Sequence, residues 1–243
     1  MNVAEKIKGK IDRIDTGTLF DYNALGITPD EVLAASKAIS RLTAEGTIRR
    51  AKKGIYYKPK QSAFGEVKPR EEALLSRYLF DDNRQIAYIT GIRLYNRLGL
   101  TTQVPNSVHV ASVEKQVKGK VGNLLIKPAK SYVKVTQGNI RFLEFLDVIK
   151  DLNVIPDLTK KDGFDYLKTE ITRFDNNKEV KKLVSYGLEY PPKVKALLGA
   201  LLEDSNIDAA DYRLLKNAIN PMSQYQYGIS PKLLPNANNW NII

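Results

Sequence analysis

The sequence predicts an α+β protein, with a small N-terminal part of helices and a hairpin and then a mixed α/β part that ends in helices. Two observations predict this class. Apolar residues recur at helical spacing in some segments and alternate as in strands in others. The chain has 243 residues and is 43% hydrophobic, which is enough for one large domain or two modest ones.

A first helix is expected from Val3 to Ile14. Apolar residues recur there every three or four positions, and the basic residues lie mostly off the apolar face. Asp21 to Leu25 then predicts one or two helical turns, which Gly26 ends. These segments precede a more strongly marked helix.

That third helix is predicted from Thr28 to Gly46. Thr28 and Glu31 have the spacing of a capping box, and Pro29 suits the first helical position. Gly46 suits the residue after a helix end. One face of this helix combines two cations and two hydroxyls with no acid between them, namely Ser36, Lys37, Ser40 and Arg41.

A hairpin is expected directly after this helix. Residues 47–50 and 55–58 alternate like strands, and residues 51–54, which include a glycine, connect them. The hairpin concentrates four cations within five residues, namely Arg49, Arg50, Lys52 and Lys53. Like charges placed this closely repel each other, and a bound polyanion relieves the repulsion. Phosphate contact is therefore favoured over a plain solvated surface.

Three helices followed by a basic hairpin, all within residues 1–60, are the order of a winged helix-turn-helix domain that binds DNA. In that geometry the third helix enters the major groove and the hairpin contacts phosphates beside it. Two alternatives stay open: a winged helix that contacts protein, and a small α/β lobe of another kind. Residues 61–68, between two prolines, are expected to be a linker.

Residues 69–243 are predicted to form a C-terminal α/β domain. Short strands are expected at 85–89, 107–112, 121–127 and 132–136. Helices are expected at 70–80, 92–100, 142–152, 165–174, 178–186, 192–202 and 209–218. The tail, residues 225–243, is apolar enough to pack back onto the body as an irregular strap. A division near residue 155 into a sheet lobe and a helical lobe is left open.

The net charge of +11 is unevenly distributed, because the first 130 residues carry +10 of it. This favours a polyanionic partner that contacts the N-terminal half of the chain. Charge alone does not distinguish DNA, RNA and an acidic protein.

Several function classes are disfavoured. The chain has no cysteine and one histidine, His109, so disulfides, thiolate metal sites and multi-histidine sites are excluded. No glycine-rich phosphate motif occurs, and no apolar run approaches the ~20 residues of a membrane span. Two or three of the acids Glu144, Asp147 and Asp151 can share one helix face, which is expected to be solvated and not to bind a metal. Acid–base chemistry by carboxylates alone stays open, although no pair of residues indicates it. We expect a cytoplasmic protein that is not an enzyme and has no cofactor or metal.

Two blocks of sequence resemble the abortive-infection AbiE-type antitoxins. The first, AISRLTAEGTIRRAKKGIYYKP (residues 38–59), is similar to that family's helix-plus-wing signature. The second, ITGIRLYNRLGLTTQVPNSVHVAS (residues 89–112), is similar to a later block in which a glycine-led helix precedes a strand. The resemblance covers about residues 5–150 and is weak after Pro156.

The resemblance implies an antitoxin and transcriptional autorepressor of a type IV toxin–antitoxin operon. The family's toxin is a nucleotidyltransferase-like protein, and its neutralisation is thought not to require a stable complex. By the same resemblance, the winged helix binds inverted repeats in the operon promoter and the second domain is needed for antitoxicity. Residues that fall on the signature are Ser40, Arg41, Arg49, Arg50 and Gly54, while Lys37, Lys52 and Lys53 match in charge only.

The sequence therefore predicts a DNA-binding antitoxin and repressor whose partner is double-stranded DNA. The residues expected to contact DNA are Ser36, Lys37, Ser40, Arg41, Arg49, Arg50, Lys52 and Lys53. One alternative is a protein-interaction module whose basic front binds an acidic partner such as the toxin. A second alternative is an enzyme that acts on nucleic acid through Glu144, Asp147 or Asp151.

Overall fold

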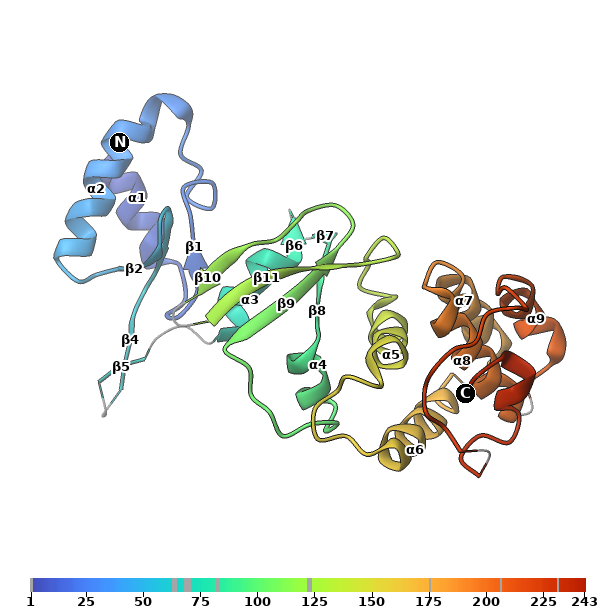
Figure 1. The fold of residues 1–243 in the computed structure, drawn as a ribbon. Coiled ribbons are helices and arrows are strands. Elements are labelled where there is room, and N and C mark those ends of the chain that lie inside the picture. The colour runs from blue at the N-terminus through green and yellow to red at the C-terminus, as the bar shows by residue number, and fades with distance from the viewer. Residues whose placement is uncertain are drawn as a thin grey trace. The chain divides into compact units, whose positions relative to one another are not determined.

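Figure 1 shows the fold of the chain in a computed structural model. The structure describes residues 2–62, 65–67, 71–81, 84–121, 124–174, 176–205, 207–230 and 232–243. The chain forms two compact units: an N-terminal unit of residues 1–78 with 120–124, and a C-terminal unit of residues 79–119 with 125–243. Helices and several small sheets occur together, so the predicted α+β class is confirmed.

Two helices and a turn of 3-10 helix form the helical part of the core of the N-terminal unit. Helix α1 (Val3–Asp12) begins at a capping box that Asn2 forms with Glu5. The 3-10 turn η1 (Pro29–Glu31) leads into helix α2 (Val32–Ala44), and α1 lies beside α2 in Figure 1. Their apolar faces form one core, which consists of Ile7, Ile11, Phe20, Leu25, Ala35, Ala38, Ile39, Leu42, Ile48 and Tyr56.

The short helical segment expected at residues 21–25 is a single hydrogen-bonded turn. The Leu25 amide donates to the Asp21 carbonyl over 3.3 Å, and the Ala24 amide donates to the Asp21 carboxylate over 2.9 Å. Gly26 ends the turn with φ 54°, a conformation that glycine adopts without strain.

A three-stranded antiparallel sheet completes the core of this unit. Strands β1 (Leu19–Phe20), β3 (Ile55–Tyr57) and β2 (Arg49–Lys52) lie in the order β1-β3-β2. The expected hairpin is thus present as β2 and β3, with a bulge between Arg50 and Lys52. The interpretation of this unit as a winged helix-turn-helix stays a prediction.

The segment expected to be a linker contains a strand pair. Strand β4 (Lys60–Ser62) pairs antiparallel with β5 (Gly65–Val67), and helix α3 (Glu71–Leu79) follows. Residues 63, 64 and 68 of the expected linker lie outside the described part of the chain. Glu66 of β5 binds side chains of β2 and β3, and this contact gives the segment a fixed partner that its sequence does not reveal.

Strands β8 (Tyr88–Thr90), β9 (Ser107–Ser112) and β11 (Leu124–Lys130) form the main sheet after residue 79. The sheet order is β10-β11-β9-β8, with β10 at Gly119–Val121. Strand β9 is antiparallel to β8 and parallel to β11. Strands β6 (Phe80–Asp81) and β7 (Arg84–Gln85) form a separate pair, and helix α4 (Ile92–Arg97) follows β8.

The strand expected at residues 132–136 is not formed, so this prediction is wrong. Local side-chain bonds occupy its backbone groups instead. The Ser131 hydroxyl donates to the Val133 carbonyl over 2.6 Å. The Asn139 side chain accepts from the Thr136 amide and donates to the Lys134 carbonyl, both over 2.9 Å. Such bonds compete with a strand ladder.

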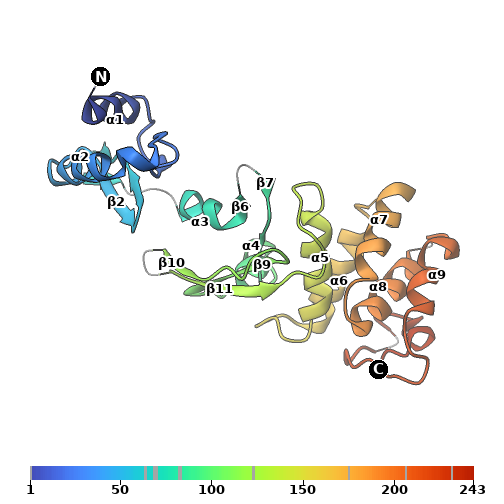
Figure 2. The same cartoon turned by 90° about the horizontal axis from the view of Figure 1, so that it is seen from above.

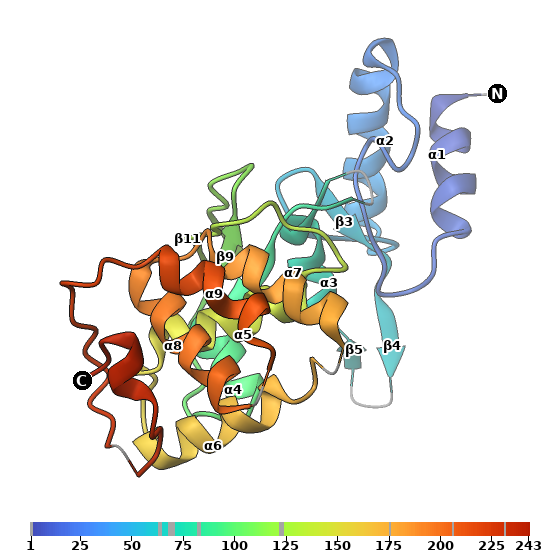
Figure 3. The same ribbon diagram turned by 90° about the vertical axis from the view of Figure 1, so that its right-hand side faces the viewer.

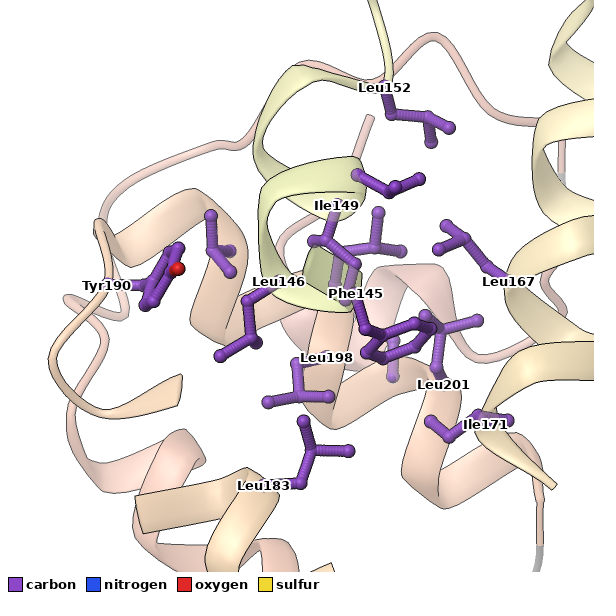
Figure 4. Packing of buried hydrophobic residues seen from close by; sticks show 14 of the residues in the cluster. Phe145, Leu146, Ile149, Leu152, Leu167, Ile171, Leu183, Tyr190, Leu198 and Leu201 are labelled. Carbon is purple, nitrogen blue, oxygen red and sulfur yellow. The ribbon is translucent and has the colours of Figure 1, made fainter. Parts of the chain in front are cut away.

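Five helices lie side by side in the C-terminal unit (Figure 2). They are α5 (Ile140–Asp151), α6 (Lys160–Ile171), α7 (Asn177–Gly187), α8 (Pro192–Asp204) and α9 (Ala209–Asn217). Figure 4 shows side chains of α5, α6, α7 and α8 meeting in one core. The same core includes Tyr88 and Tyr95 near the sheet, so sheet and helices form one unit.

The C-terminal tail packs on this unit, as the sequence predicts. In Figure 3 it lies beside the helices as an irregular segment with one short 3-10 helix, η2 (Ala237–Trp240). Tyr225 and Ile242 form a parallel bridge, and both are buried. The Trp240 indole donates to a Glu203 carboxylate oxygen over 2.6 Å and lies against Gly199.

Candidate nucleic-acid interface

Helix α2 has one buried face and one exposed face. Ala35, Ala38, Ile39 and Leu42 are buried, and the four residues predicted to face DNA are exposed, namely Ser36, Lys37, Ser40 and Arg41. We call these four residues the α2 face. Arg41 forms an ion pair with Glu45 over 3.5 Å, with both side chains more than half exposed. An exposed pair of this kind contributes little, so Arg41 remains available to a ligand.

Sequence reasoning missed Leu33, which lies on the same side of α2. Its side chain is 81% exposed, and Val32 beside it is 41% exposed. Leu33 precedes Lys37 by four residues and Ser40 by seven, so all three lie along one stripe of the helix. This spacing was the available signal, but leucine in an amphipathic helix is usually interpreted as a core residue.

Arg49 is held in place by contacts inside the N-terminal unit. Its Nε donates to a Glu66 carboxylate oxygen over 3.0 Å, and the Tyr57 hydroxyl donates to the other oxygen over 3.0 Å. A Cβ at Gly46 would lie 3.0 Å from Arg49 Nη1, so the guanidinium packs against the end of α2. Burial, followed by the Glu66 contact, raises the pKa of Tyr57. Arg49 therefore connects α2, β2 and β5.

The other cations of the hairpin are Arg50, Lys52 and Lys53. Arg50 and Lys53 are exposed, and Arg50 interacts electrostatically with Tyr56 across the sheet. Lys52 lies in β2, but its side chain is outside the described part of the structure. Gly54 forms the turn with φ 78°, which favours glycine over residues with a Cβ.

Three lysines of the N-terminal unit bind groups of the same unit. Lys6 binds both carboxylate oxygens of Glu31 over 2.8 Å, and Lys10 donates to the Leu25 carbonyl over 2.6 Å. Lys58 donates to the Asp12 carbonyl over 3.1 Å. The hydrogen bond from Lys6, followed by that from the Thr28 amide, lowers the pKa of Glu31. These three lysines stabilise the fold. The number of cations available to a ligand is therefore smaller than the net charge suggests.

The structure corrects the prediction that Glu144, Asp147 and Asp151 form a solvated helix face. Asp147 is completely buried and accepts hydrogen bonds from four groups: the Thr90 hydroxyl at 2.5 Å, the Tyr88 hydroxyl at 2.9 Å, Lys150 at 2.9 Å and the Tyr190 hydroxyl at 3.4 Å. Burial raises the pKa of Asp147, although Lys150 opposes this shift. The signal missed was the apolar character of α5, which is buried on most sides.

The other two acids also have partners. Glu144 accepts from Arg97 over 2.5 Å, and Asp151 accepts from the Tyr95 hydroxyl over 2.5 Å. No group of histidine and acid side chains suited to a metal ion is found among the residues that the structure describes. The single histidine, His109, lies on β9 with its ring against Gly91, and burial lowers its pKa.

These features define an α+β protein with a basic, exposed helix face in a small N-terminal unit and a larger unit whose apolar core encloses the hydrogen-bonded carboxylate of Asp147. The chain belongs to a family of unknown function, DUF6088, whose profile matches residues 6–152. A search of curated proteins gave no match. None of the helices in the described ranges is long and apolar enough to cross a membrane.

The fold is also found among solved structures. The crystal structure of the RV2827C protein from Mycobacterium tuberculosis matches with a TM-score of 0.52 over 92% of this chain and 84% of that chain. The sequence identity is 11%, so the likeness concerns the fold alone.

Proposed function

We propose that the protein is a sequence-specific, double-stranded DNA-binding repressor that acts as the antitoxin of a type IV toxin–antitoxin operon. The observation that carries the DNA-binding part is the α2 face, with two cations and two hydroxyls, directly ahead of the β2–β3 hairpin.

Each part of this surface has a chemical role in the proposal. Lys37 and Arg41, assisted by Ser36 and Ser40, contact base edges in the major groove. Guanidinium and ammonium groups donate to guanine O6 and N7, and hydroxyls bond to several bases. The hairpin supplies Arg50, Lys52 and Lys53 to backbone phosphates, which orient the helix without reading sequence.

Arg49 has a more indirect role than its charge suggests. Its bond to Glu66 and its contact with Gly46 fix the angle between the end of α2 and the hairpin. In the proposal Arg49 is a positioning residue that also offers its remaining guanidinium N–H groups to a phosphate.

The antitoxin part of the proposal is supported by the resemblance of residues 38–59 and 89–112 to AbiE-type antitoxins. Both blocks lie inside the segment that defines the family of this chain. The proposed partner is a nucleotidyltransferase-like toxin, which is neutralised in the cytoplasm without a stable complex. The C-terminal unit supports this role and performs no catalysis in the proposal.

Fluorescence anisotropy of the purified full-length protein tests the DNA-binding part. The protein is titrated onto labelled duplex from the region upstream of its own gene and onto a scrambled duplex, across a salt series. We expect preference for the upstream duplex, and a log–log salt slope of about −0.9 per neutralised phosphate. Equal, weak binding to both duplexes would overturn the repressor proposal.

A protein-interaction module is the second candidate, and exposed Val32 and Leu33 favour it, because neighbouring exposed apolar side chains also suit a protein contact. Its partner would be an acidic protein such as the toxin. Co-purification of toxin and this chain that survives nuclease treatment and high salt would support this candidate over DNA binding.

A further inference from the structure

Helix α7 of the C-terminal unit also has a basic face. Its apolar residues Val180, Leu183 and Val184 are buried in the core. The opposite side exposes three lysines at positions i, i+3 and i+4, with a serine at i+7, namely Lys178, Lys181, Lys182 and Ser185. Residues 131–243 carry a net charge of only +1, so three lysines on one helical turn are a local concentration.

This face lines an open groove of about 590 Å³, together with Asn177 and Tyr186. The acidic residue of this helix, Glu179, accepts a hydrogen bond from Arg141 over 2.6 Å. Arg141 is itself held over the rings of Phe142 and Phe174, at 5.1 and 4.9 Å. Arg141 therefore binds the carboxylate of Glu179 from a fixed position beside these rings.

We propose that this α7 groove binds the phosphate backbone of double-stranded DNA and is a second DNA contact of the protein. The proposal rests on the DNA-binding function proposed for the N-terminal unit and adds a site that the sequence prediction did not include. Charge complementarity favours a polyanion, and the DNA-binding function proposed above selects DNA among polyanions. The groove offers ammonium groups, an amide and a hydroxyl, which are all donors to phosphate oxygens.

The dimensions of the lysine cluster fit a phosphate backbone. Lys178 and Lys182 are separated by about 6 Å along the helix axis, at ~1.5 Å per residue. One DNA strand has a phosphate every ~3.4 Å of duplex axis, so the groove faces about two phosphates. Such contacts add affinity and salt dependence without sequence preference, because they do not reach base edges.

The test compares two triple variants of the full-length protein that lose the same charge. In the groove variant, Lys178→Gln, Lys181→Gln and Lys182→Gln are combined. In the control variant, Lys193→Gln, Lys195→Gln and Lys232→Gln are combined, from the same unit but outside the groove. Anisotropy titrations on the upstream and scrambled duplexes are run from low to moderate salt, and thermal unfolding of each variant is measured.

We expect the groove variant to bind both duplexes about tenfold more weakly at low salt, with a salt slope shallower by about 2. Its ratio of specific to nonspecific affinity should be unchanged, and the control variant should bind like the wild type. A groove variant with wild-type affinity and slope, while the wild type still prefers the upstream duplex, overturns the α7 site and leaves the repressor proposal standing.

Three further outcomes also count against the α7 site. Absence of DNA binding by the wild type overturns both proposals together. An equal loss of affinity in both triple variants shows a long-range charge effect, and the groove is then no binding site. Loss of binding to poly-L-glutamate in the groove variant, with DNA binding retained, assigns the groove to an acidic protein and overturns the proposal.

Discussion

The two units use their polar side chains in opposite ways. In the N-terminal unit the core is apolar apart from the Tyr56 hydroxyl, and the polar residues of the α2 face lie at the surface. In the C-terminal unit a carboxylate, Asp147, lies at the centre of a hydrogen-bonded network inside the core. The folding of the first unit is therefore largely independent of its proposed binding residues, whereas the second unit depends on its central acid.

The largest effect is expected on deletion of the central acid. Asp147→Ala leaves the mostly buried Lys150 ammonium without its closest partner. Breaking such a pair by removing one member costs about 3–5 kcal/mol. The chain has one tryptophan, Trp240, which is buried in the C-terminal unit, so its fluorescence in urea reports the unfolding of that unit.

Asp165→Ala is the matched control. It removes a carboxylate from an exposed pair with Lys161 on α6, worth about 0.3–0.5 kcal/mol. DNA binding by folded Asp147→Ala should retain the preference for the upstream duplex. Equal urea midpoints for the two variants would contradict the central role of Asp147.

The second comparison places the same glycine-to-alanine change in a helix of each unit. At Gly199 in α8 a Cβ would lie 2.1 Å from the Trp240 ring, so Gly199→Ala should displace the ring at a cost of about 1–3 kcal/mol. At Gly9 in α1 no atom lies within 4 Å, and alanine should stabilise the helix by up to about 1 kcal/mol.

Circular dichroism and tryptophan fluorescence distinguish these outcomes. Gly199→Ala should shift the Trp240 emission to longer wavelength and lower the unfolding temperature, whereas Gly9→Ala should do neither. Unchanged emission in Gly199→Ala would show that the tail is not anchored by this contact.

A third comparison lies within the N-terminal unit, between the α2 face and the hairpin. Arg41→Ala should remove about 1–3 kcal/mol of discrimination between upstream and scrambled duplex. Lys53→Ala should weaken binding to both duplexes about equally and reduce the salt slope by about 1. An unchanged ratio of specific to nonspecific affinity in Arg41→Ala would show that α2 is not the element that reads sequence.

The sequence predicted features that depend on interactions between neighbouring residues, and it missed features that depend on residues far apart in the chain. Helix α2 was predictable because its cap, its apolar spacing and Gly46 all lie within the helix or next to it. Asp147 was not, because its partners Tyr88 and Thr90 lie 59 and 57 residues away along the chain. In the same way, the hydrogen bond from Arg49 to Glu66 changes the role of Arg49, and the spacing of residues around the hairpin does not reveal this bond.

The smallest effect concerns the connection between α1 and the start of α2. Because the pKa of Glu31 is lowered in the fold from its usual value near 4.5, the Lys6–Glu31 pair stabilises the N-terminal unit above about pH 4.5. The stabilisation is lost as the pH falls through the lowered pKa. Glu31→Gln should therefore lower the unfolding temperature slightly at neutral pH, and the difference from wild type should shrink in acid. Lys6→Met should remove the same pH-dependent difference, and the double variant should add nothing further. A difference between Glu31→Gln and wild type that stays constant with pH would show that the pair does not couple the two helices.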